Sequence, residues 1–310
     1  MAPAQARTVA VPPSTKPGKA GRKPRDDQLD LFGLTHAGRV RAENQDHFLM
    51  CTVHPEVVIH GTSLPAPDQL PLRGERLATL LLVADGVGGG SAGAEASQLA
   101  TETITKYVAS TLRCYHTAGS AAEHEFFDAL NAAALEAHDA VRAEAAAQGA
   151  VPGPGGGSGM ATTLTLAIAV WPWLYVVQVG DSRCYMFSRG ILRQVTRDQT
   201  IAQELVDRGV LQPEQAATSP LGSVLASSIG GREAMPEVTR LDIRRRGAVV
   251  LLCSDGLTRH VSDEEIGRQL GAIQSSEQVC RALLDLALER GGSDNITVVV
   301  GRARPEERGP

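Results

Sequence analysis

A chain of 310 residues with 43% hydrophobic residues can bury a substantial core, and this length allows one or two domains. Only 4% of the residues are aromatic, so the core has to be mostly aliphatic. The five cysteines lie far apart and form no C-x-x-C pair, which argues against a cysteine zinc site and is typical of reduced thiols in a cytoplasmic protein.

The net charge of −5 is unevenly distributed along the chain. Residues 1–25 carry six Lys or Arg and no acid, so the remaining 285 residues carry −11. The segment is rich in Pro and Ala and has neither an apolar periodicity nor the apolar stretch of a signal peptide. We expect residues 1–29 to form a disordered basic tail, 30–304 a single domain and 305–310 a short C-terminal tail. Contact of the basic tail with nucleic acid or an acidic partner is the alternative, and we expect no nucleic-acid partner.

Strands are predicted from short apolar or alternating runs. They lie near residues 31–36, 46–53, 78–84, 161–170, 173–180, 183–188, 238–243, 247–253 and 295–301. Helical spacing predicts helices at about 92–113 and 123–148, and a Ser-Ser-Glu capping signal opens a third near 275–290. Loops are expected at the Pro-rich 61–74, at the Gly-rich 152–159 and in parts of 197–236.

One uncharged stretch, residues 161–180, is about as long as a membrane span. Pro172 lies in its middle between Trp171 and Trp173, and larger apolar residues alternate with smaller ones before it. Two strands joined by a Trp-Pro-Trp turn fit this pattern better than a spanning helix. We therefore expect no membrane association.

The stretch LLLVADGVGGGSAGAEAS (80–97) has two interpretations, a phosphate-binding loop or a metal site at Asp85. Gly88, Gly90 and Gly93 fit the dinucleotide pattern G-x-G-x-x-G. A dinucleotide-binding unit needs a parallel strand soon after its first helix, whereas here a second helix follows. Strands before and after this helix pair favour an α+β fold of antiparallel sheets covered by helices. We therefore interpret the glycine match as accidental.

Five aspartates lie at the ends of predicted strands. Asp85, Asp181 and Asp255 close apolar runs, whereas Asp46 and Asp294 precede them. Each alone would be read as an ordinary turn residue. A carboxylate at the rim of a sheet is costly to desolvate without a cation, and Mg²⁺ and Mn²⁺ prefer oxygen ligands. Together the five therefore indicate a divalent-metal site.

Six motifs occur in one order along residues 31–303. They are RAENQD (41–46), DGVGG (85–89), GMATT (159–163), GDSR (180–183), SDGL (254–257) and DNIT (294–297). Together they resemble the metal-dependent protein phosphatase family, the type 2C Ser/Thr phosphatases, in its bacterial form. The resemblance implies an α-β-β-α sandwich, in which helices flank two mostly antiparallel sheets.

The resemblance also implies two core Mg²⁺ or Mn²⁺ ions and a third, more weakly bound ion. Asp85 would bridge two ions, and the carbonyl oxygen of Gly86 would bind one of them. Asp255 and Asp294 would complete the shell of the first ion. Asp46 would act directly or through bound water.

The remaining implied roles concern the third ion and the substrate. Asp181 would hold the third ion, and Arg41 would receive the substrate phosphate, for which its planar guanidinium is suited. Taken alone, Arg41 is better explained as a surface ion pair near Glu43. The expected reaction is hydrolysis of phosphoserine and phosphothreonine on proteins by metal-activated water, opposing a bacterial Ser/Thr kinase. The alternative is a family member that acts as a regulatory binding module with weak catalysis.

Some positions depart from the family pattern, among them Ala226-Ser227-Ser228, where relatives often contain Arg. Val87 stands where many eukaryotic relatives carry a histidine that could protonate the leaving oxygen, which leaves a metal-bound water or His260 as the candidate acid. Gln45 replaces a frequent Glu, and Ser219 in the flap-like segment 197–236 replaces a frequent His before Pro220. We expect a cytoplasmic monomer.

Overall fold

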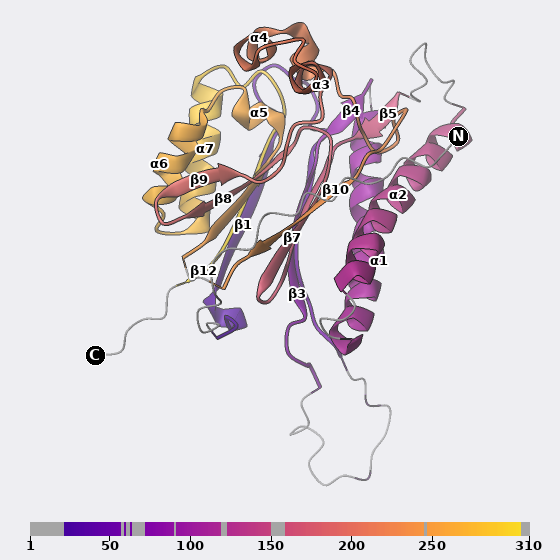
Figure 1. The fold of residues 1–310 in the computed structure, drawn as a ribbon, viewed down its shortest axis with the longest axis vertical. Helices are drawn as coiled ribbons and strands as arrows, with labels where there is room; N and C mark the ends of the chain where they lie inside the picture. Colours follow the sequence, from indigo (N-terminus) through magenta and orange to yellow (C-terminus); the bar gives the residue numbers. More distant parts are fainter. Residues whose placement is uncertain are drawn as a thin grey trace.

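The computed structural model describes residues 22–56, 59, 63, 72–89, 91–118, 123–149, 159–244 and 247–304. Two five-stranded antiparallel sheets lie face to face at its centre (Figure 1). In spatial order, the first sheet contains β1 (Leu29–His36), β12 (Ile296–Ala303), β11 (Val249–Cys253), β8 (Arg183–Ser188) and β9 (Ile191–Gln194). The second contains β10 (Glu237–Asp242), β7 (Trp173–Val179), β6 (Leu164–Val170), β3 (Ala78–Ala84) and β2 (His47–Val53).

Helices cover the outer face of each sheet. The long helices α1 (Ala92–Ala118) and α2 (Glu123–Ala147) pack on the second sheet, and α6 (Asp263–Gly271) and α7 (Ser276–Glu289) pack on the first (Figure 1). Every residue of β3 is buried, because one face meets the helices and the other meets the opposite sheet. The predicted α-β-β-α sandwich is confirmed.

The elements that sequence patterns did not predict are short. They are β4 (Gly86–Gly88), β9, α3 (Ile201–Asp207), α4 (Pro213–Thr218), α5 (Asp255–Thr258), α6 and the 3-10 helices Asp26–Gln28 and Pro220–Ser223. Most of them contain too few residues to display a hydrophobic period, whereas α6 has Ile266 and Leu270 buried four residues apart. The predicted strand 161–170 is divided into β5 (Met160–Thr162) and β6. The structure also extends the first long helix to Ala118, beyond the predicted residue 113.

The uncharged stretch forms a hairpin as predicted. Strands β6 and β7 pair antiparallel, with Val170 opposite Trp173 across the Trp171–Pro172 turn. In the part of the chain that the structure describes, none of the helices has the combined length and hydropathy of a membrane span.

The predicted N-terminal tail falls partly outside the described residues, which begin at residue 22. From there to β1 the chain packs against the domain, because Arg76 donates to the carbonyl oxygen of Pro24 at 2.7 Å and pairs with Asp26. The predicted segment 1–29 is therefore too long at its C-terminal end. The tail 305–310 and most of the expected loops 61–74 and 152–159 lie outside the described residues.

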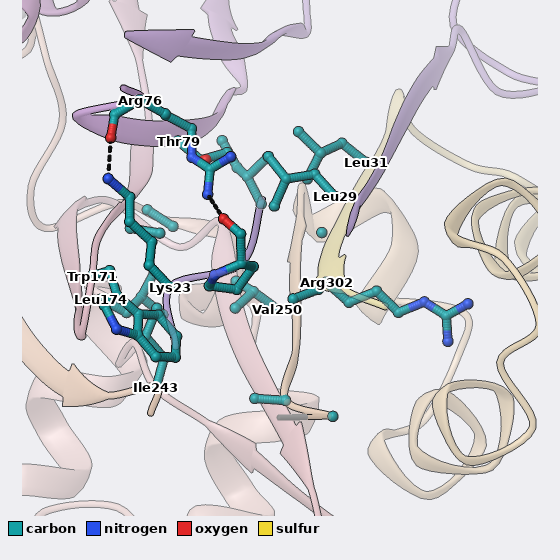
Figure 2. A pocket seen from close by; sticks show the side chains of 18 residues that line it. Lys23, Leu29, Leu31, Arg76, Thr79, Trp171, Leu174, Ile243, Val250 and Arg302 are labelled. Carbon is teal, nitrogen blue, oxygen red and sulfur yellow. Dashed lines mark hydrogen bonds between the residues drawn. The ribbon is translucent and has the colours of Figure 1, made fainter. Parts of the chain in front are cut away.

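A small apolar cavity of about 100 Å³ lies between the sheets, near the starts of β1 and β3 and the end of β12 (Figure 2). Leu31, Leu174 and Val250 line it, and the described residues around it include no carboxylate, imidazole or thiol. Arg302 at its rim is tied to Asp30 at 2.8 Å. This cavity is part of the core packing and offers no catalytic group.

Candidate metal centre

Strand pairing in the second sheet brings Asp46 and Asp85 together. Asp46 directly precedes β2, and Asp85 directly follows β3. The two strands are antiparallel, with His47 opposite Ala84, so the start of one lies beside the end of the other. The two carboxylates therefore meet at one end of the sandwich.

The first sheet contributes two more carboxylates to this end by the same geometry. Asp255 follows β11, and Asp294 precedes β12 by two residues. Cys253 is opposite Val298 in the antiparallel pair of these strands. Asp181 lies in the connection from β7 of the second sheet to β8 of the first. All five predicted aspartates thus lie at the same end of the molecule.

Asp46 has one oxygen bound and one oxygen without a partner. Its Oδ2 accepts hydrogen bonds from Ser254 Oγ at 2.8 Å and Thr297 Oγ1 at 2.7 Å. Its Oδ1 is buried, and no described residue donates to it. Burial raises the pKa of Asp46 to about 6. An unpartnered buried carboxylate oxygen is costly unless a cation binds it, so this oxygen is a candidate metal ligand.

Asp85 lies at the electrostatic centre of the group. Burial raises its pKa well above the ordinary range, and the charges of Asp46, Asp255, Asp181 and Asp294 raise it further. Burial and the charge of Asp255 likewise raise the pKa of Asp181 to about 8. Carboxylates that repel one another at a buried site require positive charge to remain ionised near neutral pH.

Two threonines of the GMATT motif fix the backbone of Asp85. Its amide donates to Thr163 Oγ1 at 3.0 Å, and its carbonyl oxygen accepts from the Thr163 amide at 2.9 Å. The same carbonyl oxygen accepts from Thr162 Oγ1 at 2.9 Å. This motif therefore positions the aspartate that follows β3.

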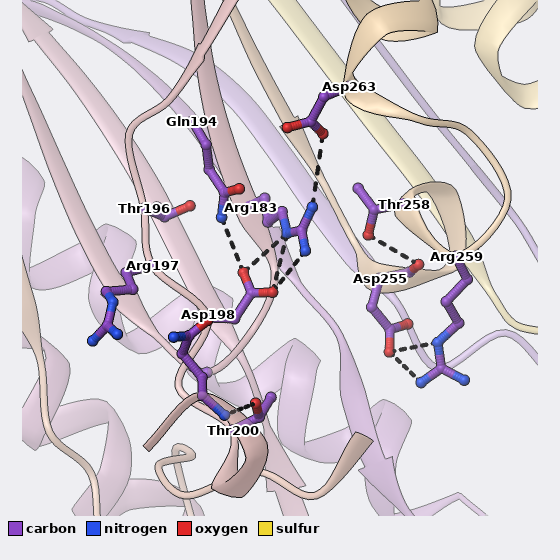
Figure 3. A network of polar contacts seen from close by, with 12 residues as sticks. Arg183, Gln194, Thr196, Arg197, Asp198, Thr200, Asp255, Thr258, Arg259 and Asp263 are labelled. Carbon is purple, nitrogen blue, oxygen red and sulfur yellow. Dashed lines mark hydrogen bonds and ion pairs between the residues drawn. The ribbon is translucent and has the colours of Figure 1, made fainter. Parts of the chain in front are cut away.

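Two arginines form ion pairs with Asp255 and Asp294. Arg41 forms a bidentate pair with Asp294, at 2.8 Å and 2.9 Å. Arg259 donates through Nε to Asp255 at 2.9 Å (Figure 3). Its Nη1 lies 3.5 Å from Asp294. Sequence reasoning missed Arg259, although its position four residues after Asp255 on a helical turn is a recognisable signal.

No three His, Cys, Asp or Glu side chains of the described residues lie close enough together to hold one metal ion. Asp255 and Asp294 instead face arginines, and Asp46 faces hydroxyl groups. The donor set nevertheless fits Mg²⁺ or Mn²⁺, because it consists of oxygens and includes the unpartnered Asp46 Oδ1.

Gly86 lies where no side chain fits. A Cβ there would overlap the carbonyl oxygen of Gly93 and lie 2.6 Å from the carbonyl oxygen of Gln45. Gly86→Ala should therefore shift the backbone beside Asp85, lower stability by about 1–3 kcal/mol and weaken Mn²⁺ binding. The measurements are thermal denaturation and calorimetric titration with Mn²⁺.

Gly89→Ala is the matched control for Gly86→Ala. A Cβ at Gly89 would meet nothing within 4 Å, so this variant should match the wild type in stability and Mn²⁺ affinity. Equal behaviour of the two alanine variants would contradict the assigned role of Gly86.

The structure shows the surroundings of three other residues that the sequence analysis singled out. Val87 is 45% exposed on β4. Gln45 uses its backbone amide to bond Asn295 Oδ1 at 2.9 Å. His260 Nε2 accepts the Ser293 amide at 3.0 Å, and His260 does not line the pocket beside the carboxylates. The geometry therefore gives no support to His260 as the general acid.

An open pocket of about 600 Å³ lies beside the carboxylates and beneath the segment 197–236. Asp181, Asp255 and Arg259 form one side of it, and Ser219 and Ser223 of the helical segment form the other. The pocket is lined mainly by polar and charged groups and can admit a phosphorylated side chain.

Known serine/threonine phosphatases are similar to this chain in sequence. The chain is 37% identical over 223 residues to the serine/threonine protein phosphatase PstP of Mycobacterium tuberculosis. The aligned region covers 72% of this chain and 40% of PstP. The serine/threonine phosphatase stp of Listeria monocytogenes is 31% identical over 125 residues, or 40% of this chain and 50% of that protein. The chain thus spans about half the length, or less, of these relatives.

Solved structures match over a larger share. The crystal structure of Mycobacterium tuberculosis PstP/Ppp has a TM-score of 0.68 and 31% identity, covering 89% of this chain and 99% of that chain. The catalytic domain of PstP in complex with two manganese ions has a TM-score of 0.65 and 30% identity, with the same coverage. The sequence profile described as Protein phosphatase 2C matches residues 61–291. The chain therefore belongs to the protein phosphatase 2C family.

Proposed function

We propose that this chain hydrolyses phosphoserine and phosphothreonine on proteins and uses Mg²⁺ or Mn²⁺ as its cofactor. The observation that carries the proposal is the convergence of five aspartates at one end of both sheets, with Asp46 Oδ1 buried and unpartnered among the described residues. The manganese-bound catalytic domain of PstP supports the choice of cofactor.

Each carboxylate has an assigned role in this proposal. Asp85, the Gly86 carbonyl oxygen, Asp255 and Asp294 would hold the two core ions. Asp46 would bind directly or through water, and Asp181 would hold a third, weaker ion. When bound, Mg²⁺ or Mn²⁺ supplies Lewis acidity that polarises phosphoryl oxygens and lowers the pKa of water.

The protein's own groups orient these ligands and the substrate. Ser254 and Thr297 fix Asp46 through Oδ2, and Oδ1 keeps no donor among the described residues. Arg41, released from Asp294, can donate two parallel N–H groups to a phosphate. The charge-assisted hydrogen bonds hold the phosphorus in position for attack by water.

The cellular setting belongs to the same proposal. A Ser/Thr kinase would generate the phosphorylated substrates, and we propose a cytoplasmic, monomeric enzyme. Support for a reducing compartment comes from Cys51, Cys184, Cys253 and Cys280, which are all free thiols in the described part of the chain.

A phosphothreonine peptide assay tests the proposal. Release of inorganic phosphate should require Mn²⁺ or Mg²⁺, stop when a chelator removes the ion, and return when the ion is added back. Activity that persists after chelation would overturn the metal-dependent mechanism, and absence of hydrolysis with either ion would overturn the enzymatic function.

Arg41→Ala tests the phosphate contact. A charge-assisted hydrogen bond contributes about 1.5–3 kcal/mol, so we expect kcat/KM to fall roughly tenfold to a hundredfold, mainly through a higher KM. Steady-state kinetics with the phosphothreonine peptide measure both constants. An unchanged kcat/KM would show that Arg41 serves only its ion pair with Asp294.

A further inference from the structure

Two arginines line the pocket beneath the segment 197–236, and they differ in what holds them. Arg183 donates to Asp198 at 2.9 Å and 2.7 Å (Figure 3). It also donates to the Tyr185 hydroxyl at 2.9 Å. Neither Asp198 nor Tyr185 belongs to the proposed metal ligands. Arg183 therefore keeps its partners whether or not a metal ion binds.

Arg259 is held only by carboxylates that are proposed metal ligands, as far as the described residues show. Its Nε lies 2.9 Å from Asp255 Oδ2, and its Nη1 lies 3.5 Å from Asp294 Oδ2. The side chain is 40% exposed toward the pocket. A divalent cation on Asp255 and Asp294 would compete for the same oxygen atoms, so metal binding would free the guanidinium.

The formal charges indicate when an anion can enter. The five aspartates and the guanidiniums of Arg41 and Arg259 together carry −3. Two divalent cations would change this charge to +1. A phosphate dianion is therefore repelled by the metal-free centre and attracted by the metal-loaded one.

We propose that Arg259 is a second phosphate-binding guanidinium, which Asp255 and Asp294 hold until metal binding releases it into the pocket. The inference rests on the proposed function and deepens it, because it couples binding of the substrate phosphate to binding of the metal. Such coupling is reciprocal: Arg259 weakens metal binding in the absence of phosphate, and phosphate strengthens it.

Calorimetric titration with Mn²⁺ and with inorganic phosphate tests the inference on the whole chain. The wild type should bind phosphate only after loading with Mn²⁺. Arg259→Gln should weaken phosphate binding by roughly tenfold to a hundredfold and, in the absence of phosphate, tighten Mn²⁺ binding. Arg259→Lys should fall between the two, because it keeps the charge but loses the planar fork.

The matched control is Arg268→Gln, since Arg268 is exposed on α6 and pairs only with Glu265 among the described residues. It should match the wild type in both titrations. Phosphate affinity of Arg259→Gln within about twofold of the wild type would overturn the inference, as would a loss of Mn²⁺ affinity. Thermal denaturation verifies that each variant is folded. If Arg259→Gln does not fold, the phosphate affinity of Arg259→Lys tests the inference in its place.

Neither titration requires turnover. A chain that fails to hydrolyse phosphopeptides and still shows Arg259-dependent phosphate binding would contradict the proposed function while supporting this inference. If the enzyme is active and its phosphate affinity does not depend on Arg259, this inference is overturned while the proposed function stands.

Discussion

Replacing Asp85 by Asn should lower kcat for phosphopeptide hydrolysis by about a thousandfold while leaving the fold intact. The substitution keeps the shape of the side chain but removes the charge at the centre of the five carboxylates. Metal ions supply several kcal/mol of transition-state stabilisation, which corresponds to a factor of this size. Initial rates with saturating Mn²⁺ measure the effect.

A second measurement separates lost chemistry from lost structure. Burial and neighbouring charges raise the pKa of Asp85, so its ionised form disfavours the metal-free fold. The chelated Asn variant should therefore melt at the same temperature as the chelated wild type, or higher. Asp285→Asn, at an exposed position of α7, is the control and should retain full activity. An Asp85→Asn variant with wild-type kcat would exclude Asp85 from the catalytic centre.

Chelated protein should lose stability as the pH rises from about 4 to 8, and Mn²⁺ should restore it. Aspartates of the unfolded chain ionise near 3.8, whereas Asp46 keeps its proton to about pH 6 and Asp181 to about pH 8. The unfolded state then binds fewer protons than the folded state, so the free energy of unfolding falls with pH. For Asp46 alone the loss is about 3 kcal/mol, or roughly 6–12 °C in Tm.

The Asp46→Asn variant isolates this effect. Burial lowers the pKa of His138, so protonation of that residue destabilises the fold at low pH and acts in the opposite direction. The difference between wild type and Asp46→Asn, measured by thermal denaturation across pH 4–8 in chelator, removes this background. In saturating Mn²⁺ the wild type should no longer lose stability as the pH rises, because the bound cation favours the ionised form of Asp46. A difference that does not vary with pH would show that Asp46 is ionised throughout.

Local sequence patterns were sufficient to predict the long helices and strands. The apolar run before Asp85 predicted β3, and the Ser275 capping signal predicted α7, where Ser275 Oγ accepts the Gln278 amide at 3.1 Å. Helical spacing also predicted α2 close to its observed bounds. Each of these elements is specified by residues only a few positions apart in sequence, and therefore the sequence alone predicts it.

The order of the six motifs also indicated which side chains belong to one site. Asp46 and Asp85 lie 39 positions apart in sequence, and Asp294 lies more than 200 positions beyond them. Nothing local relates them, so their common role followed from the resemblance to a known family. The structure then brought them to one end of the sandwich through antiparallel pairing.

Only the tertiary structure decided the electrostatic partners within the site. The Arg41–Asp294 pair joins residues 253 positions apart, and sequence reasoning favoured Glu43 as the neighbour of Arg41. The structure also showed that Arg259 forms ion pairs with both Asp255 and Asp294. Sequence therefore determined the fold class and the identity of the carboxylates, since both follow from patterns along the chain. Which cations face those carboxylates depends on distances across two sheets, and only the folded chain sets those distances.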